Sequence, residues 1–452
     1  MAAGTQGEDA VRKLPVSSPR APAGTDADDT MRRSARQAAG FFAASLLLAV
    51  GVGGLLGSLL LATLTTGTNW LGSWGAPGVR RAHAYAQVFG FAAMYVMGVA
   101  FHVIPRLTGQ VLRARVSLPA ALLSGAVGSV AAIGLALADS SSLVAWRTAH
   151  LLLSLSALSF GWAIAQHLRG AELPGPMRAY LLAGCGWFVV AAALPVLAPS
   201  GVRTLPAVWE AMLWGFAASW IYGMSLRILP AALGAPWQPA WADRWVWLAH
   251  QLGVASWVAA HAIAAGPWWS HAPTRLLAGT GAVALSLAAT AYTLRVGLFA
   301  PNRRPVAHPL PGTEKFLFAA YAWLLVAVIE GLVWAAWHAL RGTPSGGPSL
   351  DFARHAFTLG FLSQMIFGVS MRVIPTAAGL PLWSERWRDA SFWLLNAAVA
   401  LRLSEVAAFV QGLGWLYPWT AVSGLLAWAA FVAFAVNVIM TLRRGRQATP
   451  TP

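Results

Sequence analysis

Cysteine and charged residues are scarce in this sequence. Cys185 is the only cysteine, which excludes a disulfide-stabilised scaffold and a thiolate metal site. Only 10% of the residues are charged and 58% are hydrophobic, whereas a soluble domain has about a quarter of its residues charged. So few charges cannot cover the surface of a water-soluble protein of 452 residues. The 44 glycines and 24 tryptophans suit an integral membrane protein, where glycine allows close helix packing and tryptophan anchors at the lipid interface.

The motifs of soluble catalysis are also missing. The sequence has no glycine-rich phosphate loop, nucleophile elbow, metalloprotease histidine pair or nucleotide fingerprint. The formal net charge of +16 does not indicate nucleic acid, because the arginines fall mostly in short segments between apolar runs. We therefore expect the lipid bilayer as a partner and no nucleic acid.

Twelve apolar segments follow a polar N-terminal stretch, and each is near the roughly 20 residues that cross a bilayer. They are apolar throughout, without the alternation of strands, and so predict helices. The segments are 37–66, 81–105, 117–138, 143–167, 178–199, 206–230, 241–265, 274–298, 315–340, 351–375, 389–411 and 418–442. We expect an all-α polytopic membrane domain at 37–445, between a disordered tail at 1–36 and a short C-terminal tail at 446–452.

Arginine and lysine mark one side of these segments. If the segments alternate in direction, most basic residues fall on the same side as both termini. These residues lie in the tail (Arg32, Arg33, Arg36), at 106–115, 169–178 and 303–315, at Arg386 and Arg388, and at 443–446. The positive-inside rule therefore predicts that both termini are cytoplasmic.

An internal repeat is the most informative feature of the chain. Residues 84–109 recur without gaps at 209–234 and 354–379. Four positions match in all three copies: Gly90, Gly98, Pro105 and Gly109; Gly215, Gly223, Pro230 and Gly234; Gly360, Gly368, Pro375 and Gly379. The copies fall on segments 2, 6 and 10, so we expect three pseudo-symmetric four-helix units. We expect the glycines to serve close helix packing and each proline to mark the end of its helix.

Histidine is the candidate ligand, because ionisable groups inside a bilayer are costly and are usually functional. His83 and His355 lie near the outer starts of segments 2 and 10, and we expect them to clamp a haem b axially. Further candidate metal ligands lie at similar depth: His150, His261, His338 and Glu210. Copper is a second expected cofactor. The alternative for each histidine is a hydrogen bond to its neighbours. Arg402 and Glu405 are three residues apart and are expected to pair.

Two stretches carry a resemblance to a known family. Ala82-His83-Ala-Tyr-Ala-Gln-Val-Phe-Gly-Phe resembles the His-Ala-His-x-x-x-Phe-Gly-Phe run of the NnrS family, and Arg354-His355-Ala-Phe-Thr-Leu-Gly resembles its later His-Ala-x-Thr-x-Gly run. That family is similar to the catalytic subunit of haem-copper oxidases. The resemblance implies a haem- and copper-containing protein of the bacterial inner membrane that responds to nitric oxide and nitrosative stress.

The departures from these families limit the expected chemistry. The wider superfamily brings a histidine from helix 6, a histidine pair from helix 7 and two histidines from helix 10. Here segment 6 offers Glu210, segment 7 has no adjacent pair, and Tyr85 replaces the second histidine of the first run. The expectation is one haem, nitric oxide or a related small molecule as ligand, and an electron donor as a possible partner. Two alternatives stay open: a divergent oxidase or nitric oxide reductase subunit, and a cofactor-free transporter.

Overall fold

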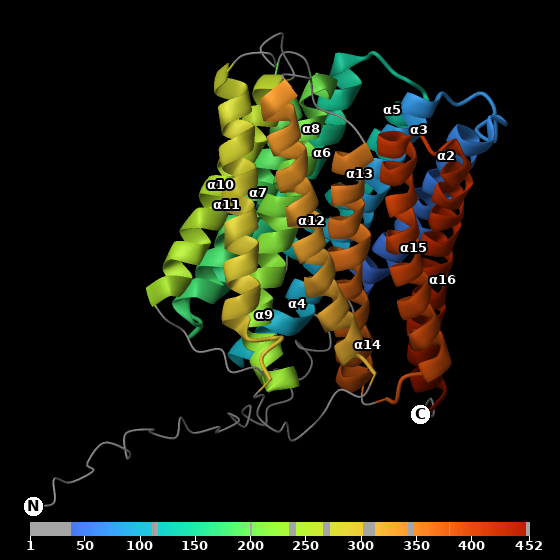
Figure 1. Cartoon of the computed structure of the whole chain (residues 1–452). Coiled ribbons are helices and arrows are strands. Elements are labelled where there is room, and N and C mark those ends of the chain that lie inside the picture. Colours follow the sequence, from blue (N-terminus) through green and yellow to red (C-terminus); the bar gives the residue numbers. More distant parts are fainter. Residues whose placement is uncertain are drawn as a thin grey trace, which may run out of the picture.

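The computed structural model describes residues 38–110, 112, 116–198, 201–234, 241–264, 272–301, 312–341, 348–378 and 380–448. These residues contain helices and no strand, and the helices form one bundle (Figure 1). The predicted tail at 1–36 lies outside the described residues. The predicted C-terminal tail at 446–452 overlaps the last helix, which continues to Ala448.

The helices follow the twelve predicted segments. The first is a continuous helical run, Ala38–Thr66, that contains η1 (Ala49–Gly54) and α2 (Leu55–Thr66). The others are α3 (Ala76–Tyr85), η2 (Ala86–Ala93) and α4 (Met94–Thr108); α5 (Ser117–Leu137); α6 (Leu143–Arg169); α7 (Gly175–Leu197); α8 (Leu205–Glu210), η4 (Ala211–Ala218) and α9 (Ser219–Leu233); α10 (Trp241–Ala264); α11 (Ala272–Val296); α12 (Glu314–Arg341); α13 (Pro348–His355), η6 (Ala356–Ser363) and α14 (Gln364–Ala378); α15 (Glu385–Gln411); and α16 (Tyr417–Ala448). Two short 3₁₀ turns are η3 (Gly201–Thr204) and η7 (Gly414–Leu416).

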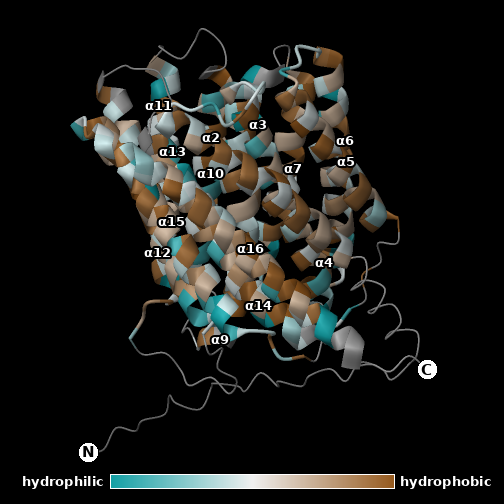
Figure 2. Ribbon diagram, turned by 90° about the vertical axis from the view of Figure 1, so that its right-hand side faces the viewer, coloured by the Kyte–Doolittle hydropathy of each residue, from teal (hydrophilic) through white to brown (hydrophobic). Residues whose placement is uncertain are grey.

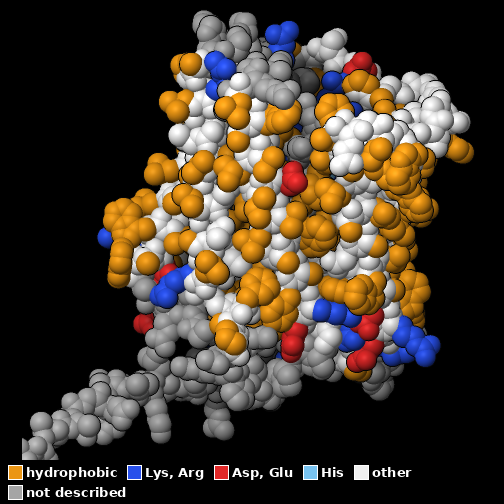
Figure 3. Space-filling model, viewed as in Figure 1, with side chains coloured by type: hydrophobic (Ala, Val, Ile, Leu, Met, Phe, Trp, Pro, Cys, Tyr) orange, Lys and Arg blue, Asp and Glu red, His pale blue; other side chains and the backbone are white. Residues whose placement is uncertain are grey.

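Ten of the helices in the described residues are long and apolar enough to cross a membrane. The run α8–η4–α9 and helix α10 are also long but are not among these ten. Hydrophobic residues run along the helices in Figure 2, and in Figure 3 hydrophobic side chains are spread along the whole face, while most charged side chains lie toward its two ends. The chain is therefore a multi-pass membrane protein.

The three copies of the repeat have the same helical design. Each contains an eight-residue π-helical segment, η2, η4 or η6, that begins at the same aligned position, residue 86, 211 or 356. A π-helical turn has i→i+5 hydrogen bonds and so takes in more residues than an α-helical turn, which changes the directions of the side chains on either side. The sequence repeat is therefore also a repeat of backbone structure.

Each repeat helix continues beyond the proline that was expected to mark its end. Pro105, Pro230 and Pro375 lie inside α4, α9 and α14, and each helix continues for three more residues. Gly109 and Gly234 follow the last residues of α4 and α9 with φ of 64° and 62°. Glycine adopts this left-handed conformation without a Cβ clash, so glycine and not proline ends these helices. Gly379, the third equivalent, lies outside the described residues.

The aligned glycines bring each repeat helix against the helix before it in the chain. An added Cβ on Gly90, Gly215 or Gly360 would stand 2.8, 2.5 or 2.5 Å from a side chain of the first span, α7 or α12. The second glycine of each copy packs against the same three helices, with distances of 3.0, 3.1 and 2.7 Å at Gly98, Gly223 and Gly368. The expected packing role of the glycines is confirmed.

The repeat helices form the centre of the bundle. At the apolar centre of Ala76–Thr108, 94% of the residues are buried, against 28% for Glu385–Gln411 at the periphery. The π-helical segments also meet one another, since η4 contacts both η2 and η6. In Figure 1, α3, α8 and α13 lie at the upper end of the bundle and α4, α9 and α14 at the lower end. His83, Glu210 and His355 therefore belong to the upper end.

Candidate functional site

His83 lies in the last turn of α3 and faces the first span. Its imidazole packs on Gly57 of α2, where an added Cβ would stand 2.6 Å from Cε1. Nδ1 lies 2.7 Å from the carbonyl oxygen of Gly53 in η1. Because a carbonyl oxygen only accepts hydrogen bonds, Nδ1 carries the proton and Nε2 presents a lone pair.

His355, the last residue of α13, makes the corresponding bond within its own helix. Nδ1 lies 2.7 Å from the carbonyl oxygen of Asp351, one turn earlier, and 3.6 Å from Oδ2 of the same residue. Nδ1 is again the donor, so the lone pair of this ring is also on Nε2. Asp351 thus fixes both the orientation and the tautomer of His355.

A charged cluster supports this histidine. The Asp351 carboxylate accepts a hydrogen bond from the guanidinium of Arg402 on α15. The same guanidinium lies 3.1 Å from Oε2 of Glu405. The predicted pairing of Arg402 with Glu405 is confirmed, whereas the part played by Asp351 was not predicted.

Helices α3 and α13, which carry His83 and His355, both lie at the upper end of the bundle. Among the described residues, neither Nε2 has a hydrogen-bond partner, while both Nδ1 atoms are bonded to carbonyl oxygens. Iron and other metals bind an imidazole through a nitrogen lone pair, and the other ring nitrogen is normally hydrogen-bonded, as it is in both rings here. In chemical type, these two nitrogen lone pairs fit haem iron.

Glu210 has a different role from the metal ligand that was expected. Its side chain is 1% exposed and forms an ion pair with Arg354 of α13. Oε1 accepts from Nε and Nη2 of Arg354 at 2.9 and 2.6 Å, and Oε2 accepts from the indole of Trp257 at 2.9 Å. A guanidinium beside the carboxylate repels a metal cation, and both oxygens are already bonded. Glu210 is the acidic half of a buried pair that joins α8 to α13.

His150 also has partners on both ring nitrogens. Nδ1 lies 3.2 Å from the carbonyl oxygen of Ala192, and Nε2 lies 2.7 Å from the hydroxyl of Tyr85. Nδ1 is therefore the donor, and Nε2 accepts from the phenol. This arrangement links α3, α6 and α7, and it is the neighbour hydrogen bonding that was the alternative to metal ligation. Tyr85 thus provides the hydroxyl donor to His150.

The remaining candidates do not complete a metal site. Nδ1 of His261 lies 2.9 Å from the carbonyl oxygen of Trp257 in its own helix, α10. The side chain of His338 lies outside the described part of the chain. Within that part, no group of three or more His, Cys, Asp or Glu side chains could hold a metal ion. The residues described do not fit a copper centre.

Two residues of the site had a signal in the sequence, one in the repeat alignment and one in the spacing along a helix. Arg354 aligns with Trp209, one position before Glu210, so the second and third copies carry opposite charges at adjacent aligned positions. Asp351 precedes His355 by four residues, the spacing at which two side chains meet on one helix face. Trp257 has no such signal, because nothing local relates it to Glu210.

Comparison with known proteins shows what this arrangement is similar to. A family model described as a domain of unknown function, DUF8744, matches residues 310–441. No curated protein matches the sequence. Among solved structures, a chain of a haem-copper terminal oxidase, determined as a dimer, is similar with a TM-score of 0.70 and 12% identity. The match covers 91% of this chain and 84% of the oxidase chain.

The first of these comparisons concerns residues 310–441 only, and the structural comparison concerns the whole fold. The chain has the fold of that haem-copper oxidase chain, and at 12% identity the likeness concerns the fold alone. The DUF8744 match covers less than a third of the sequence and spans α12 to α16 except for the last residues of α16. Its limits are close to those expected for the third four-helix unit.

Proposed function

We propose that this chain is a haem-binding membrane protein of the NnrS type that acts in the response to nitric oxide. The observation that carries the proposal is the pair of histidines, His83 and His355, from the first and third repeat helices. Both rings have Nδ1 hydrogen-bonded to a carbonyl oxygen and Nε2 without a partner among the described residues. The fold shared with a haem-copper terminal oxidase supports haem as the group they hold.

Residues of this chain would orient the two histidines and place charged groups beside them. His83 and His355 would hold haem b, and the carbonyl groups of Gly53 and Asp351 would orient their rings. Asp351 and Arg402 place a carboxylate and a guanidinium beside one ligand. A haem bound there supplies an iron that exchanges an electron with a donor protein or binds nitric oxide. Copper is not part of the proposal, because the described residues do not fit it.

The proposed topology has twelve spans in three four-helix units, with both termini in the cytoplasm of a bacterium. The α8–η4–α9 run supports this count, because it is the aligned copy of two helices that do meet the criteria for a span. The near coincidence of DUF8744 with α12 to α16 supports the division into units. The distribution of basic residues supports the orientation.

The optical spectrum of the purified protein tests the haem. We expect a reduced-minus-oxidised haem b band that is lost or converted to a high-spin form in His83→Ala and in His355→Ala. His102→Ala is the matched control, because His102 lies on α4, the lower continuation of the helix that carries His83. If both ligand variants keep the wild-type spectrum, the pair is not the haem site. A cofactor-free transporter is favoured if no band is present.

A deletion strain tests the role. We expect normal aerobic growth and increased sensitivity to a nitric oxide donor, restored by the wild-type gene and not by the His83→Ala form. Unchanged sensitivity would remove the nitric oxide role and leave the haem proposal standing. The shared fold favours a second candidate, a divergent terminal oxidase or nitric oxide reductase subunit. Sustained cyanide-sensitive oxygen uptake by the purified protein would establish the oxidase.

A further inference from the structure

A groove runs along the outside of the bundle between α15 and α16, at the lower half. Its volume is about 440 Å³. Arg386 and Trp387 lie at its mouth, Ala390 and Leu394 line the α15 side, and Trp428 and Ala433 line the α16 side. Apart from the arginine, the lining is apolar, with small alanine side chains between larger ones.

The dimensions of the groove match one leaflet of a membrane. From Arg386 to Leu394 the α15 wall rises eight residues, about 12 Å at the rise of an α-helix. On the α16 wall, the indole of Trp428 donates to the carbonyl oxygen of Val50 at 3.0 Å. One leaflet contributes about 15 Å to the hydrocarbon core. The groove therefore runs from the membrane surface through most of one leaflet.

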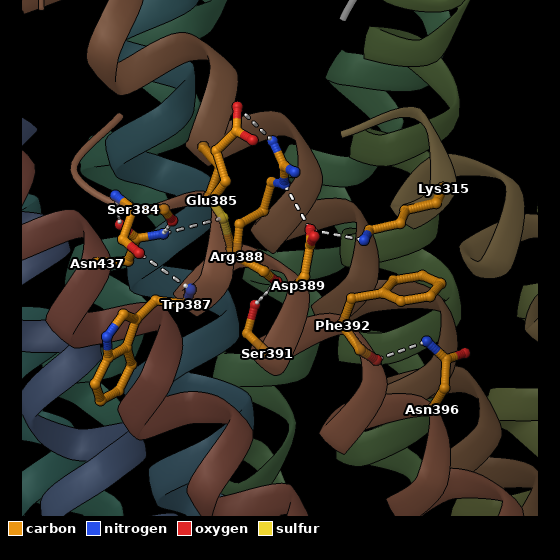
Figure 4. Close-up of polar contacts among 11 residues, drawn as sticks. Lys315, Ser384, Glu385, Trp387, Arg388, Asp389, Ser391, Phe392, Asn396 and Asn437 are labelled. Carbon is orange, nitrogen blue, oxygen red and sulfur yellow. Dashed lines mark hydrogen bonds and ion pairs between the residues drawn. The ribbon is translucent and has the colours of Figure 1, made fainter. Parts of the chain in front are cut away.

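Arg386 has no acidic partner among the described residues, although acidic side chains surround it in the sequence. Asp389 accepts from Arg388 at 2.8 Å and from Lys315 at 2.7 Å (Figure 4). Glu385 lies 3.7 Å from the same Arg388 guanidinium. Both carboxylates at the start of α15 thus have Arg388 as a partner, although the Glu385 side chain is 77% exposed. Arg386 is left as an unneutralised cation at the mouth of an apolar groove.

We propose that this groove binds an anionic phospholipid, with its phosphate at Arg386 and one acyl chain along the alanine-lined wall. A guanidinium pairs with two phosphate oxygens at once, and basic sites between helices at a membrane surface bind anionic headgroups. Trp387, exposed beside Arg386, is of the residue type that lies at headgroup depth. A second copy of the chain is the alternative occupant, and the experiment below distinguishes it from a lipid. This inference does not depend on haem.

Native mass spectrometry of the full-length protein released from nanodiscs tests the site. The discs contain equal amounts of phosphatidylglycerol and phosphatidylcholine. We expect retained phosphatidylglycerol to exceed phosphatidylcholine by about fivefold, the effect of one arginine on an anionic lipid. Arg386→Gln should remove the preference, and Arg386→Lys should keep it. Ala390 is exposed and lines the groove, so the larger ring in Ala390→Phe should fill the groove and reduce retention of both lipids.

The matched control is Arg169→Gln, because Arg169 is an exposed arginine at the lower end of α6 that does not line the groove. It should keep the wild-type preference. All variants are compared at the same elution volume, so that misfolded protein is excluded. Equal retention of the two lipids by the wild type, or an unchanged preference in Arg386→Gln, would overturn the proposal. Release of a dimer that carries no lipid, and that Ala390→Phe separates into monomers, would overturn it in favour of a second copy.

Discussion

Replacing Arg354 by glutamine should destabilise the protein far more than its partial exposure suggests. The side chain of Arg354 is 29% exposed, but its partner Glu210 is 1% exposed. The substitution leaves a carboxylate inside the bundle with only the Trp257 indole still donating to it. Removing one partner of a buried ion pair costs about 3–5 kcal/mol. We expect a loss near the lower end of this range, because one of the three donated hydrogen bonds remains.

Replacing Glu210 instead should lower stability less, and the variant with both substitutions should show how strongly the two residues are coupled. Glu210→Gln removes the buried charge and leaves Arg354 with access to the membrane surface, so we expect a loss of about 1–2 kcal/mol. In the double variant neither charge is left alone, and the loss should also be about 1–2 kcal/mol. The double variant should therefore lose at least about 2 kcal/mol less than the sum of the single variants.

Unfolding of the detergent-purified protein, followed by the fraction that stays monodisperse after denaturant or heat, measures these differences. Arg203→Gln is the control, because Arg203 is an exposed arginine in η3, directly before α8. Its stability should stay within about 0.5 kcal/mol of wild type. The reasoning is refuted if Arg354→Gln behaves like this control, or if the losses in the double variant simply add.

Three further outcomes are expected. Gly215→Leu adds a side chain at a position where even a Cβ would stand 2.5 Å from an indole, so it should lower stability in the same unfolding assay by about 1–3 kcal/mol. The control is Gly186→Leu, which has open space around the added Cβ and should change stability little. Tyr85→Phe removes the hydroxyl that donates to its histidine partner and should cost about 1–3 kcal/mol, measured the same way. A reporter fused after Gly109 should report the cytoplasm and one inserted near Gly72 the periplasm; the reverse pattern would overturn the predicted orientation.

The spans could be predicted from the sequence because lipid imposes a simple requirement. A run such as 117–138 is apolar on every side, and in a bilayer only a helix satisfies its backbone. The observed helix is Ser117–Leu137. The repeat could also be recognised from the sequence, since its glycines are needed wherever two helix backbones approach closely. The π-helical segments were not predicted, because i→i+5 bonding around Gly90, Gly215 and Gly360 depends on packing in the assembled centre.

The candidate site could be predicted only in part, because the partners of its polar side chains come from distant parts of the chain. His83 and His355 stood out because histidine inside a membrane is costly and rare. The bonds that determine what each polar group does join residues distant in the sequence: 144 residues separate Glu210 from Arg354, and 51 separate Asp351 from Arg402. Helix periodicity carries no information about such distant partners. Glu210 and His150 were therefore grouped with the metal ligands by depth alone, whereas Glu210 is bonded to Arg354 and Trp257, and His150 to the Tyr85 hydroxyl and the Ala192 carbonyl oxygen.

The separation of Glu210 from Arg354 also bears on how the protein is made. At about 5–20 residues per second, the ribosome needs roughly 7–29 s to add the 144 residues between them. During that time the helix containing Glu210 has been synthesised, but the guanidinium that neutralises it has not. Glu210 lies near the outer end of its helix, where an acidic residue costs less than the roughly 2.5–3.5 kcal/mol of the helix centre, but this cost still opposes early release into lipid. We therefore expect the sixth helix to remain beside the translocon until the tenth emerges, which makes insertion of the middle of the chain dependent on its C-terminal third.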